Sequence, residues 1–361
     1  MRRSHTTLRL ALILGALNLA QTLQAQEPID QNLHEQLILP EVLALSLQEA
    51  RQLTGWPPRP DAEAPLGAGL AAHLEVDDVR FSYRLHHEDG DDLRMGTANQ
   101  VHQAAFDHGF TLAPVQRYMD EHQFSAEFGL GEDLALVLTL PFYNKELQHL
   151  DASGQRTESR TSGLGDVILG TRVGLGEQGE RRLIFGAGIS IPTGSNTLSG
   201  EVGGQANQRL PYELQLGSGT YDLHPEIVLG RWMKRWSFGA RAAAVVRAGK
   251  NEEDYHLGDR MEASAWVSRH VDRDHSLSFR LSVVNQNQAS GQDSAMDLSL
   301  TPGNRTNATG YRRLDAFFGI QAVGSAGNRF AAEIGAPIVQ SLDGLQVDTD
   351  LVAWLSWSYG F

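Results

Sequence analysis

The sequence QFSAEFGLGEDLALVLTL, residues 123–140, carries the pattern that decides the fold. Apolar residues stand at every second position from 124 to 130 and, after the short turn 131–133, again from 134 to 140. Successive side chains of a β-strand point to opposite faces, so a period of two predicts strands rather than helices. The two segments therefore predict an antiparallel hairpin with one apolar face.

The same alternation recurs along the chain, as it must in a barrel wall that faces lipid on one side and water on the other. The expected strands are 79–86, 123–130, 134–140, 167–173, 183–191, 223–229, 236–244, 261–271, 277–283, 314–320, 330–334 and 351–361. We therefore predict an all-β fold, a transmembrane antiparallel up-and-down β-barrel of about twelve strands.

The links between these strands fall into two alternating classes. Short turns are expected near 131–133, 176–182, 231–235, 272–275 and 324–329, and long loops near 88–116, 144–163, 193–220, 247–260, 285–310 and 338–344. Short periplasmic turns and long outer loops are typical of barrels in the bacterial outer membrane, which is the expected location. The alternation places both termini in the periplasm and requires an even strand number, so roughly ten or fourteen strands are the alternatives to twelve.

The last expected strand ends in an aromatic pattern. Trp357, Tyr359 and Phe361 alternate with Ser358 and Gly360. The pattern is similar to the C-terminal signature that the barrel-insertion machinery recognises, and such aromatic residues suit the interface between lipid and water. A soluble β-sandwich is the alternative, although sandwiches rarely sort their loops into a short and a long class.

The N-terminal residues differ from the barrel. Two arginines precede an apolar stretch at 8–20, which predicts a signal peptide at 1–25, with a retained signal anchor as the alternative. Residues 26–65 contain a helical segment that Pro40 could open, followed by a Pro-rich linker. This segment could plug the lumen, dock in the periplasm or form a loosely ordered leader to the barrel at 66–361.

Composition narrows the classes of function. The chain of 361 residues has no cysteine, which excludes disulfide frameworks, thiol nucleophiles and thiolate metal sites. A formal net charge of −14 argues against a nucleic-acid partner, which would require a basic patch. The Gly-rich runs at 163–170 and 186–194 lack the spacing of nucleotide-binding loops, so we expect no cofactor. The expected partners are outer-membrane lipid, lipopolysaccharide, the insertion machinery and a small-molecule solute.

Several stretches resemble a family of outer-membrane proteins named for the meta-cleavage pathway of phenol degradation. They read PLGAGLAAHLEVDDVRFSYRLHH, RYMDEHQFSAEFGLGEDLALVLTLPFYNKEL, GLGDVILGTRVGL, GAGISIPTGS and LGSGTYDLHPEI, and they cover much of the expected barrel's first half. The resemblance implies a transporter-like barrel. It is also the source of the expected substrate class, small aromatic or apolar molecules.

Two groups of charged residues are candidates for a functional site. Acidic and basic residues at alternate strand positions are expected to face the lumen, where they could form an aqueous passage or pair with one another across a narrow interior. They are Arg80, Arg84, Glu127, Arg172, Asp222, Glu226, Arg241, Arg280, Asp315, Glu333, Asp348 and Asp350. A second group at the outer end of the first strand could bind a divalent cation or be a solvated loop: His86, His87, Asp89, Asp91 and Asp92.

Three functions are compatible with these features. The first is a channel or facilitator for passive movement of small aromatic or apolar molecules. The second is a non-conducting barrel whose outer loops bind a divalent metal or a partner. The third is an outer-membrane hydrolase, which the absence of a Gly-x-Ser-x-Gly motif disfavours. We therefore expect a protein that is not an enzyme.

Overall fold

The computed structural model describes residues 59–68, 76, 78–131, 133–178, 181–324 and 328–360. The expected signal peptide, the helical segment that follows it and Phe361 lie outside these residues.

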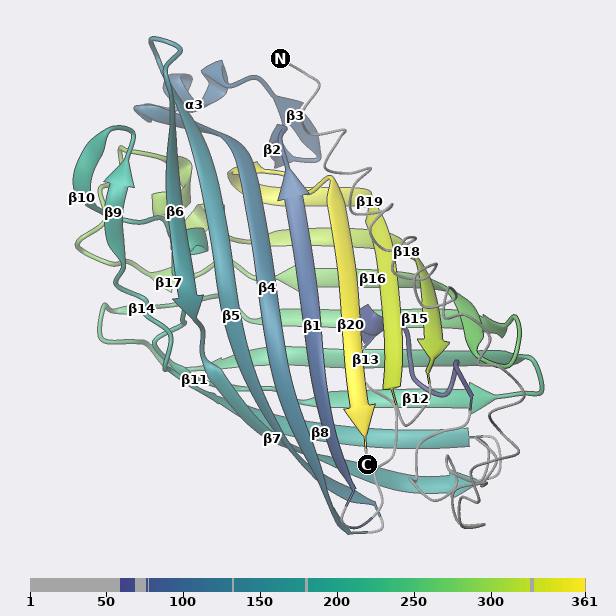
Figure 1. Ribbon diagram of the computed structural model, residues 1–361. Helices are drawn as coiled ribbons and strands as arrows, with labels where there is room; N and C mark the ends of the chain where they lie inside the picture. Colours follow the sequence, from purple (N-terminus) through teal and green to yellow (C-terminus); the bar gives the residue numbers. More distant parts are fainter. Residues whose placement is uncertain are drawn as a thin grey trace, which may run out of the picture. The chain divides into compact units, whose positions relative to one another are not determined.

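The wall is a closed antiparallel barrel of 12 strands, as the sequence predicts (Figure 1). The last strand closes it by pairing with both its predecessor and the first strand. The strands are β1 (Val79–Gly90), β4 (Leu112–Gly131), β5 (Leu134–Asp151), β7 (Val167–Gln178), β8 (Arg181–Ile191), β12 (Glu226–Trp232), β13 (Trp236–Ala248), β15 (Arg260–His270), β16 (His275–Gln286), β18 (Tyr311–Val323), β19 (Asn328–Val347) and β20 (Leu351–Gly360).

Shorter elements lie mainly in the long loops. They are η3 (Leu66–Ala68), β2 (Leu93–Gly96), β3 (Ala98–Gln100), α3 (Gln103–Asp107), β6 (Arg156–Leu164), β9 (Ser199–Val202), β10 (Gln205–Arg209), η4 (Tyr212–Leu214), β11 (Tyr221–Leu223), β14 (Tyr255–His256), β17 (Ser290–Gly291), η5 (Pro302–Asn304) and η6 (Thr306–Ala308). In the part of the chain described above, no helix has the length and apolar character needed to span a bilayer.

Each expected strand overlaps strands of the observed wall, but several observed strands extend beyond their apolar pattern toward the outer end of the barrel. β5 pairs with β7 over residues 134–139 and then with β6 over residues 142–150, where a long loop was expected. Likewise β19 continues through the loop expected at 338–344. The outward positions 144, 146 and 148 of β5 hold Asn, Glu and Gln. Strand pairing continues there because backbone hydrogen bonds do not depend on an apolar side chain.

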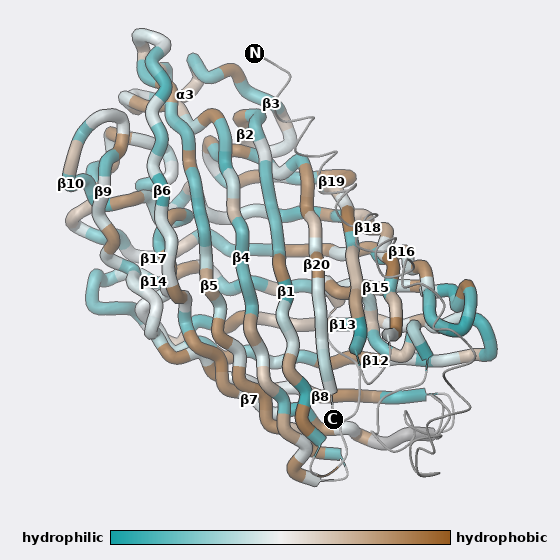
Figure 2. The backbone as a smooth tube through the Cα atoms, in the orientation of Figure 1, coloured by the Kyte–Doolittle hydropathy of each residue, from teal (hydrophilic) through white to brown (hydrophobic). Residues whose placement is uncertain are grey.

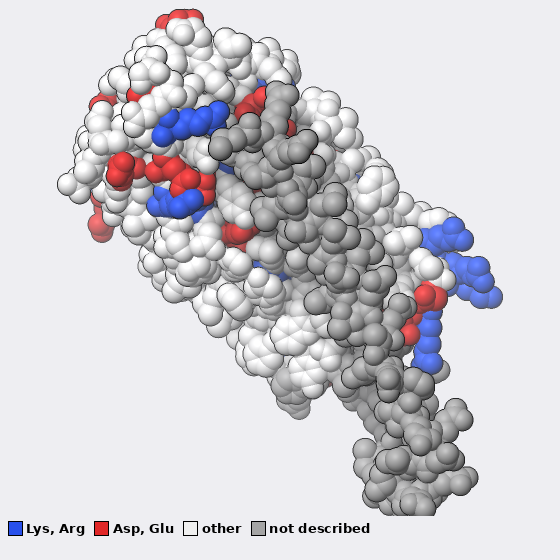
Figure 3. Space-filling view, turned by 45° about the horizontal axis from the view of Figure 1, so that its top comes forward, with Lys and Arg blue, Asp and Glu red and all other residues white. Residues whose placement is uncertain are grey.

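Side chains on the outer surface of the wall form an apolar belt. Phe81, Leu134, Leu277 and Phe318 are exposed there, and Phe318 is 67% exposed. Apolar residues dominate the lower parts of β5 and β7 in Figure 2, and hydrophilic residues dominate the upper parts of β4 to β6. On the part of the surface that is visible in Figure 3, charged side chains gather toward the two ends of the wall. An exposed apolar belt between polar ends is the surface of a barrel that spans a membrane, and the fold places it in the outer membrane.

Inward positions carry the opposite chemistry. Small serines fill the interior face of neighbouring strands, and large charged side chains are buried beside them. The buried serines on β13, β15 and β16 are Ser237, Ser264, Ser268, Ser276, Ser278 and Ser282. The lumen is therefore polar, and its charged groups need partners.

Candidate functional site: the barrel lumen

Arginine and glutamate side chains alternate around the inner part of the lumen. The alternation follows from inward positions on separate strands of the wall. We call this set the charge ring: Arg80, Glu127, Arg172, Glu226, Arg241, Glu262, Arg280 and Glu333. Neighbours in the ring contact one another at up to 4.0 Å, the distance between Arg280 Nη1 and Glu262 Oε1. Its four arginines and four glutamates balance in formal charge, and their ion pairs connect the strands from inside.

A short segment before β1, residues 59–68, lies inside the barrel at this level. We call it the inner plug. The Trp232 indole donates to the Asp61 carbonyl at 2.7 Å, and the Gln321 amide donates to the Ala64 carbonyl at 3.0 Å. Ala64 and Ala68 pack with inward residues of β8, β12 and β15. The end of the expected Pro-rich linker is thus a lumenal obstruction.

Two contacts join the inner plug to the charge ring. Glu63 Oε1 lies 3.3 Å from Arg80 Nη1, and the Gly67 backbone N–H donates to Glu333 Oε2 at 3.0 Å. A Cβ atom on Gly67 would lie 2.0 Å from Arg280 Nη2, so only glycine allows the plug backbone to lie this close to the ring. The plug and the ring therefore form one polar layer across the lumen.

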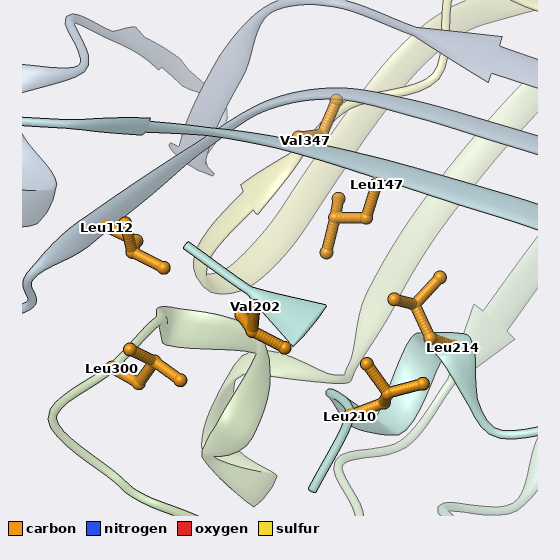
Figure 4. Close-up of a cluster of buried hydrophobic side chains, with 7 residues drawn as sticks. All are labelled: Leu112, Leu147, Val202, Leu210, Leu214, Leu300 and Val347. Atoms are coloured by element: carbon orange, nitrogen blue, oxygen red, sulfur yellow. The ribbon is translucent and has the colours of Figure 1, made fainter. Parts of the chain in front are cut away.

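The long loops close much of the outer end. A buried apolar cluster joins their short elements to the tops of β4, β5 and β19: Leu112, Leu147, Val202, Leu210, Leu214, Leu300 and Val347 (Figure 4). The Asp166 carboxylate accepts hydrogen bonds from the backbone N–H groups of Gly194 and Ser218, which fixes both ends of the loop 194–218. These contacts hold the loops over the lumen as a packed cap.

A chamber of about 670 Å³ lies between the inner plug and this cap. Leu66 and Gly67 line its inner end, and Tyr212 and Gly303 line its outer end. The wall between them contributes inward residues from most strands, including Arg84, Tyr143 and Trp354. The chamber lies along the axis of the described barrel and is large enough for a small solute.

Charged groups at the outer part of the chamber are tightly paired. Arg313 and Arg117 both contact Glu88, with Arg313 Nη2 2.9 Å from Glu88 Oε1. Burial opposes the charged form of Glu88, but Arg313 and the other cations outweigh burial and hold its pKa well below the usual range. The His86 ring stacks on Trp354 with centroids 3.8 Å apart. This part of the lumen is a rigid polar surface.

Lys145 lies at the same level, opposite Met119 in the pairing of β4 with β5. Its ammonium group donates to the Gln215 carbonyl of the cap at 2.6 Å. Burial lowers the pKa of Lys145 to about 8, against the opposite effect of Glu121 and Glu213. The cap is therefore attached to the wall through a cation that titrates near neutral pH.

The structure places ten of the predicted lumen residues on inward positions. They are Arg80, Arg84, Glu127, Arg172, Asp222, Glu226, Arg241, Arg280, Asp315 and Glu333. Asp348 and Asp350 do not line the chamber, whereas Thr349 between them does. Asp348 Oδ2 binds Arg94 at 3.0 Å and Asp350 Oδ2 accepts from the Asp91 backbone, so both lie at the outer rim. The predicted lumenal position of these two residues is wrong because they lie in the connection between β19 and β20, where side chains do not alternate between the two faces of a strand.

The predicted metal ligands do not come together. His86 and His87 are consecutive in β1, so their side chains lie on opposite faces of the wall. His86 faces Glu88 and Glu121 in the lumen, and His87 Nδ1 lies 2.8 Å from Asp120 Oδ1 outside. Asp89 accompanies His87, while Asp91 and Asp92 lie beyond the strand. Among the described residues, no group of three or more His, Asp or Glu side chains is arranged to hold a metal ion.

Several residues that face the lumen were not among the lumen candidates from the sequence, although Glu88 belongs to the sequence stretch considered for metal binding. Glu88, Arg117, Arg260, Glu262 and Arg313 occupy inward strand positions, so their parity in the alternation was a usable signal. The sequence contains no such signal for Glu63, because apolar and polar residues do not alternate in the Pro-rich linker around it. Trp357 and Tyr359 of the C-terminal signature lie opposite Tyr83 and Phe81 in β1, on the outward face of β20.

Comparisons with known proteins agree with this architecture. Residues 108–333 match a family described as "Putative MetA-pathway of phenol degradation". An outer membrane channel from Pseudomonas putida F1 is similar in fold, with a TM-score of 0.58 and 12% identity over 83% of this chain and 98% of that chain. No curated protein matches the sequence.

Two other barrels align less closely. The β domain of the Bordetella autotransporter BrkA has a TM-score of 0.43 and 9% identity, over 79% of this chain and 100% of that chain. A Pseudomonas aeruginosa FadL homologue has a TM-score of 0.40 and 10% identity, over 85% of this chain and 95% of that chain.

Proposed function

Because the chain belongs to the phenol MetA-pathway family, we propose that its barrel is a passive channel for small aromatic or apolar molecules. The observation that carries the proposal is the chamber of about 670 Å³ along the barrel axis. An engineered apolar cavity of about 150 Å³ holds benzene, so the chamber has room for one substituted aromatic ring and several waters.

The lining of the chamber favours a solute that has a polar group as well as a ring. Ser125, Tyr143 and Gln286 offer hydrogen bonds, and Leu66, Met119 and Trp354 offer apolar contact. A phenol-like molecule, with one ring and one hydroxyl group, matches this mixture. The family description supports the same class of solute.

The inner plug and the cap narrow the described lumen at the two ends of the chamber. Displacement of the plug would widen the connection between the chamber and the inner end of the barrel, because the charge ring follows the wall from strand to strand. We expect the plug to be the movable part, since hydrogen bonds and small side chains hold it rather than strand pairing.

Single-channel conductance and liposome swelling test the proposal. The mature protein, refolded into planar bilayers, should give small current steps. Proteoliposomes should swell in isosmotic solutes about the size of one aromatic ring and not in a disaccharide. Folding is checked by the heat-dependent shift in electrophoretic mobility. Folded protein that gives neither current nor swelling contradicts the channel.

Two expected partners stay predictions. Trp357 and Tyr359, on the outward face of β20, support recognition of this strand by the insertion machinery, and deletion of the last three residues should abolish assembly in cells. The polar outer surface above the apolar belt supports contact with lipopolysaccharide head groups, which binding to lipopolysaccharide micelles would test.

A further inference from the structure

Arg84 differs from the other arginines of the chamber. Each of the others contacts a carboxylate: Arg117, Arg172, Arg241, Arg247, Arg260, Arg280 and Arg313. Within the described residues, the Arg84 guanidinium has neither a hydrogen bond nor an ion pair, and it lines the chamber directly. Arg84 is half-buried and faces the chamber without a carboxylate within ion-pair distance, so its guanidinium can accept an anion supplied from outside the protein.

Strand register explains why Arg84 lacks a partner. Arg80, four residues before Arg84 on the same face of β1, lies opposite Glu127 of β4 and pairs with it. Arg84 lies opposite Gln123 of β4 and Ser356 of β20, which are neutral. The Gln123 amide is already directed to Glu121, to which it donates at 2.7 Å. The two strands that flank β1 thus place no carboxylate directly opposite Arg84, and Glu127 and Glu63 act on it only from beyond ion-pair distance.

The position of Arg84 places it on the path of a solute. It borders both the chamber and a second small cavity beside the plug, and Leu66 of the plug lines both spaces. Arg84 is four residues inward of Glu88 along β1, which is about 13 Å at 3.3 Å per residue. A solute that has passed the paired charges of the outer chamber therefore meets Arg84 just before the plug.

We propose that Arg84 binds the anionic group of the transported solute, and that this group is a carboxylate on a small aromatic ring. The inference rests on the proposed channel and narrows its substrate class from aromatic molecules in general to aromatic monocarboxylates. A guanidinium binds a carboxylate through two parallel hydrogen bonds, which a phenol hydroxyl cannot match. The ring of the solute would lie toward Leu66, and water would fill the rest of the chamber.

Benzoate and its neutral analogue benzamide form the test pair. In proteoliposomes containing the full mature protein, wild type should take up benzoate faster than benzamide. Arg84→Gln should slow benzoate uptake roughly tenfold, the loss expected for a charge-assisted hydrogen bond, and leave benzamide uptake unchanged. Arg84→Lys should retain part of the preference. Arg160→Gln, which removes the same charge from a side chain 68% exposed on the outer surface, should behave as wild type.

A second measurement uses ion selectivity. In a potassium chloride gradient, the reversal potential of wild type should indicate preference for chloride, and Arg84→Gln should shift it toward potassium. If the channel conducts and Arg84→Gln matches wild type in both reversal potential and benzoate uptake, the inference is wrong and the channel stands. If folded wild type neither conducts nor takes up either compound, the proposed function fails, and the inference fails with it.

Discussion

Glu333 binds Arg280 through both carboxylate oxygens, with Oε1 2.9 Å from Nε and Oε2 2.8 Å from Nη2. Both side chains are almost fully buried, and Glu333 also accepts the Gly67 backbone N–H. One carboxylate therefore connects β16, β19 and the inner plug. The stability of the wall and the closure of the lumen depend on the same pair.

Removing one member of this pair should destabilise the barrel strongly. Arg280→Ala leaves a buried carboxylate without its main partner, and breaking such a pair costs about 3–5 kcal/mol. Arg280→Met combined with Glu333→Leu should cost less than Arg280→Ala, because no charge is then left unpaired. Urea unfolding in lipid vesicles measures both. Equal losses in the single and double variants would show that the pair contributes little.

A methyl group at Gly67 should loosen the inner plug. Gly67→Ala places Cβ 2.0 Å from Arg280 Nη2, so the plug or the arginine must move at a cost of about 1–3 kcal/mol. Single-channel recordings should show a larger open fraction than in wild type. Gly131→Ala is the matched control, because its Cβ would meet only Leu134 Cβ at 3.7 Å. A Gly67→Ala channel that stays as closed as the control would contradict the role of the plug.

A charge on the apolar belt should oppose membrane insertion. Phe318→Arg puts a cation on the lipid-facing side of β18, which costs about 2–4 kcal/mol near the middle of the bilayer. Val101→Arg, at a side chain 73% exposed in an outer loop, should have little effect. Folding yield into vesicles and the urea midpoint are the readouts. A barrel that accepts both substitutions equally well would not be facing lipid at Phe318.

Acid should destabilise the outer part of the barrel through His149. Its side chain is fully buried above the membrane belt without a hydrogen bond to either nitrogen, and burial lowers its pKa to about 4. Between pH 6.5 and 4 the unfolded chain binds a proton that the folded chain does not, so stability falls as the pH falls. The loss is on the order of 3 kcal/mol by linkage. Above pH 6.5 both states are neutral and the effect vanishes.

His149→Phe removes this proton and should flatten that pH dependence. The quantity to compare is the urea midpoint at pH 7 and at pH 4.5, in wild type and in the variant. The difference between the two proteins should appear only at the lower pH. A drop of the same size in both would assign the acid sensitivity to other groups.

The sequence predicts the wall well because lipid imposes a period of two on every strand. In β4 and β5 each apolar position of the pattern faces outward, and the short turn between them is where it was expected. Beyond the lipid, outward positions no longer need apolar side chains, so the alternation of apolar and polar residues ends there. Asn144 and Glu146 are polar at outward positions of β5 where the pattern requires apolar residues, so the outer hairpin could not be distinguished from a loop.

The alternation of side chains along each strand predicts which residues face the lumen, but it does not predict which of them form ion pairs. Arg80 and Arg84 have the same inward parity, and only strand register shows that one faces Glu127 and the other faces Gln123. Register across the barrel depends on the tilt and on every turn between the strands, which a single sequence does not contain. Asp348 shows a second limit of the prediction. It lies after the end of β19, where odd and even positions no longer point to opposite faces of the wall.

The inner plug precedes β1 by only ten residues, 69–78, and this short connection decides how far it can travel. An extended stretch of that length reaches at most about 36 Å, so the displaced plug stays within that distance of the start of β1. Its local concentration near the pore mouth is then in the millimolar range, and resealing needs no second protein. Each opening of the channel should accordingly be brief, because the inner plug of the same chain returns and closes it.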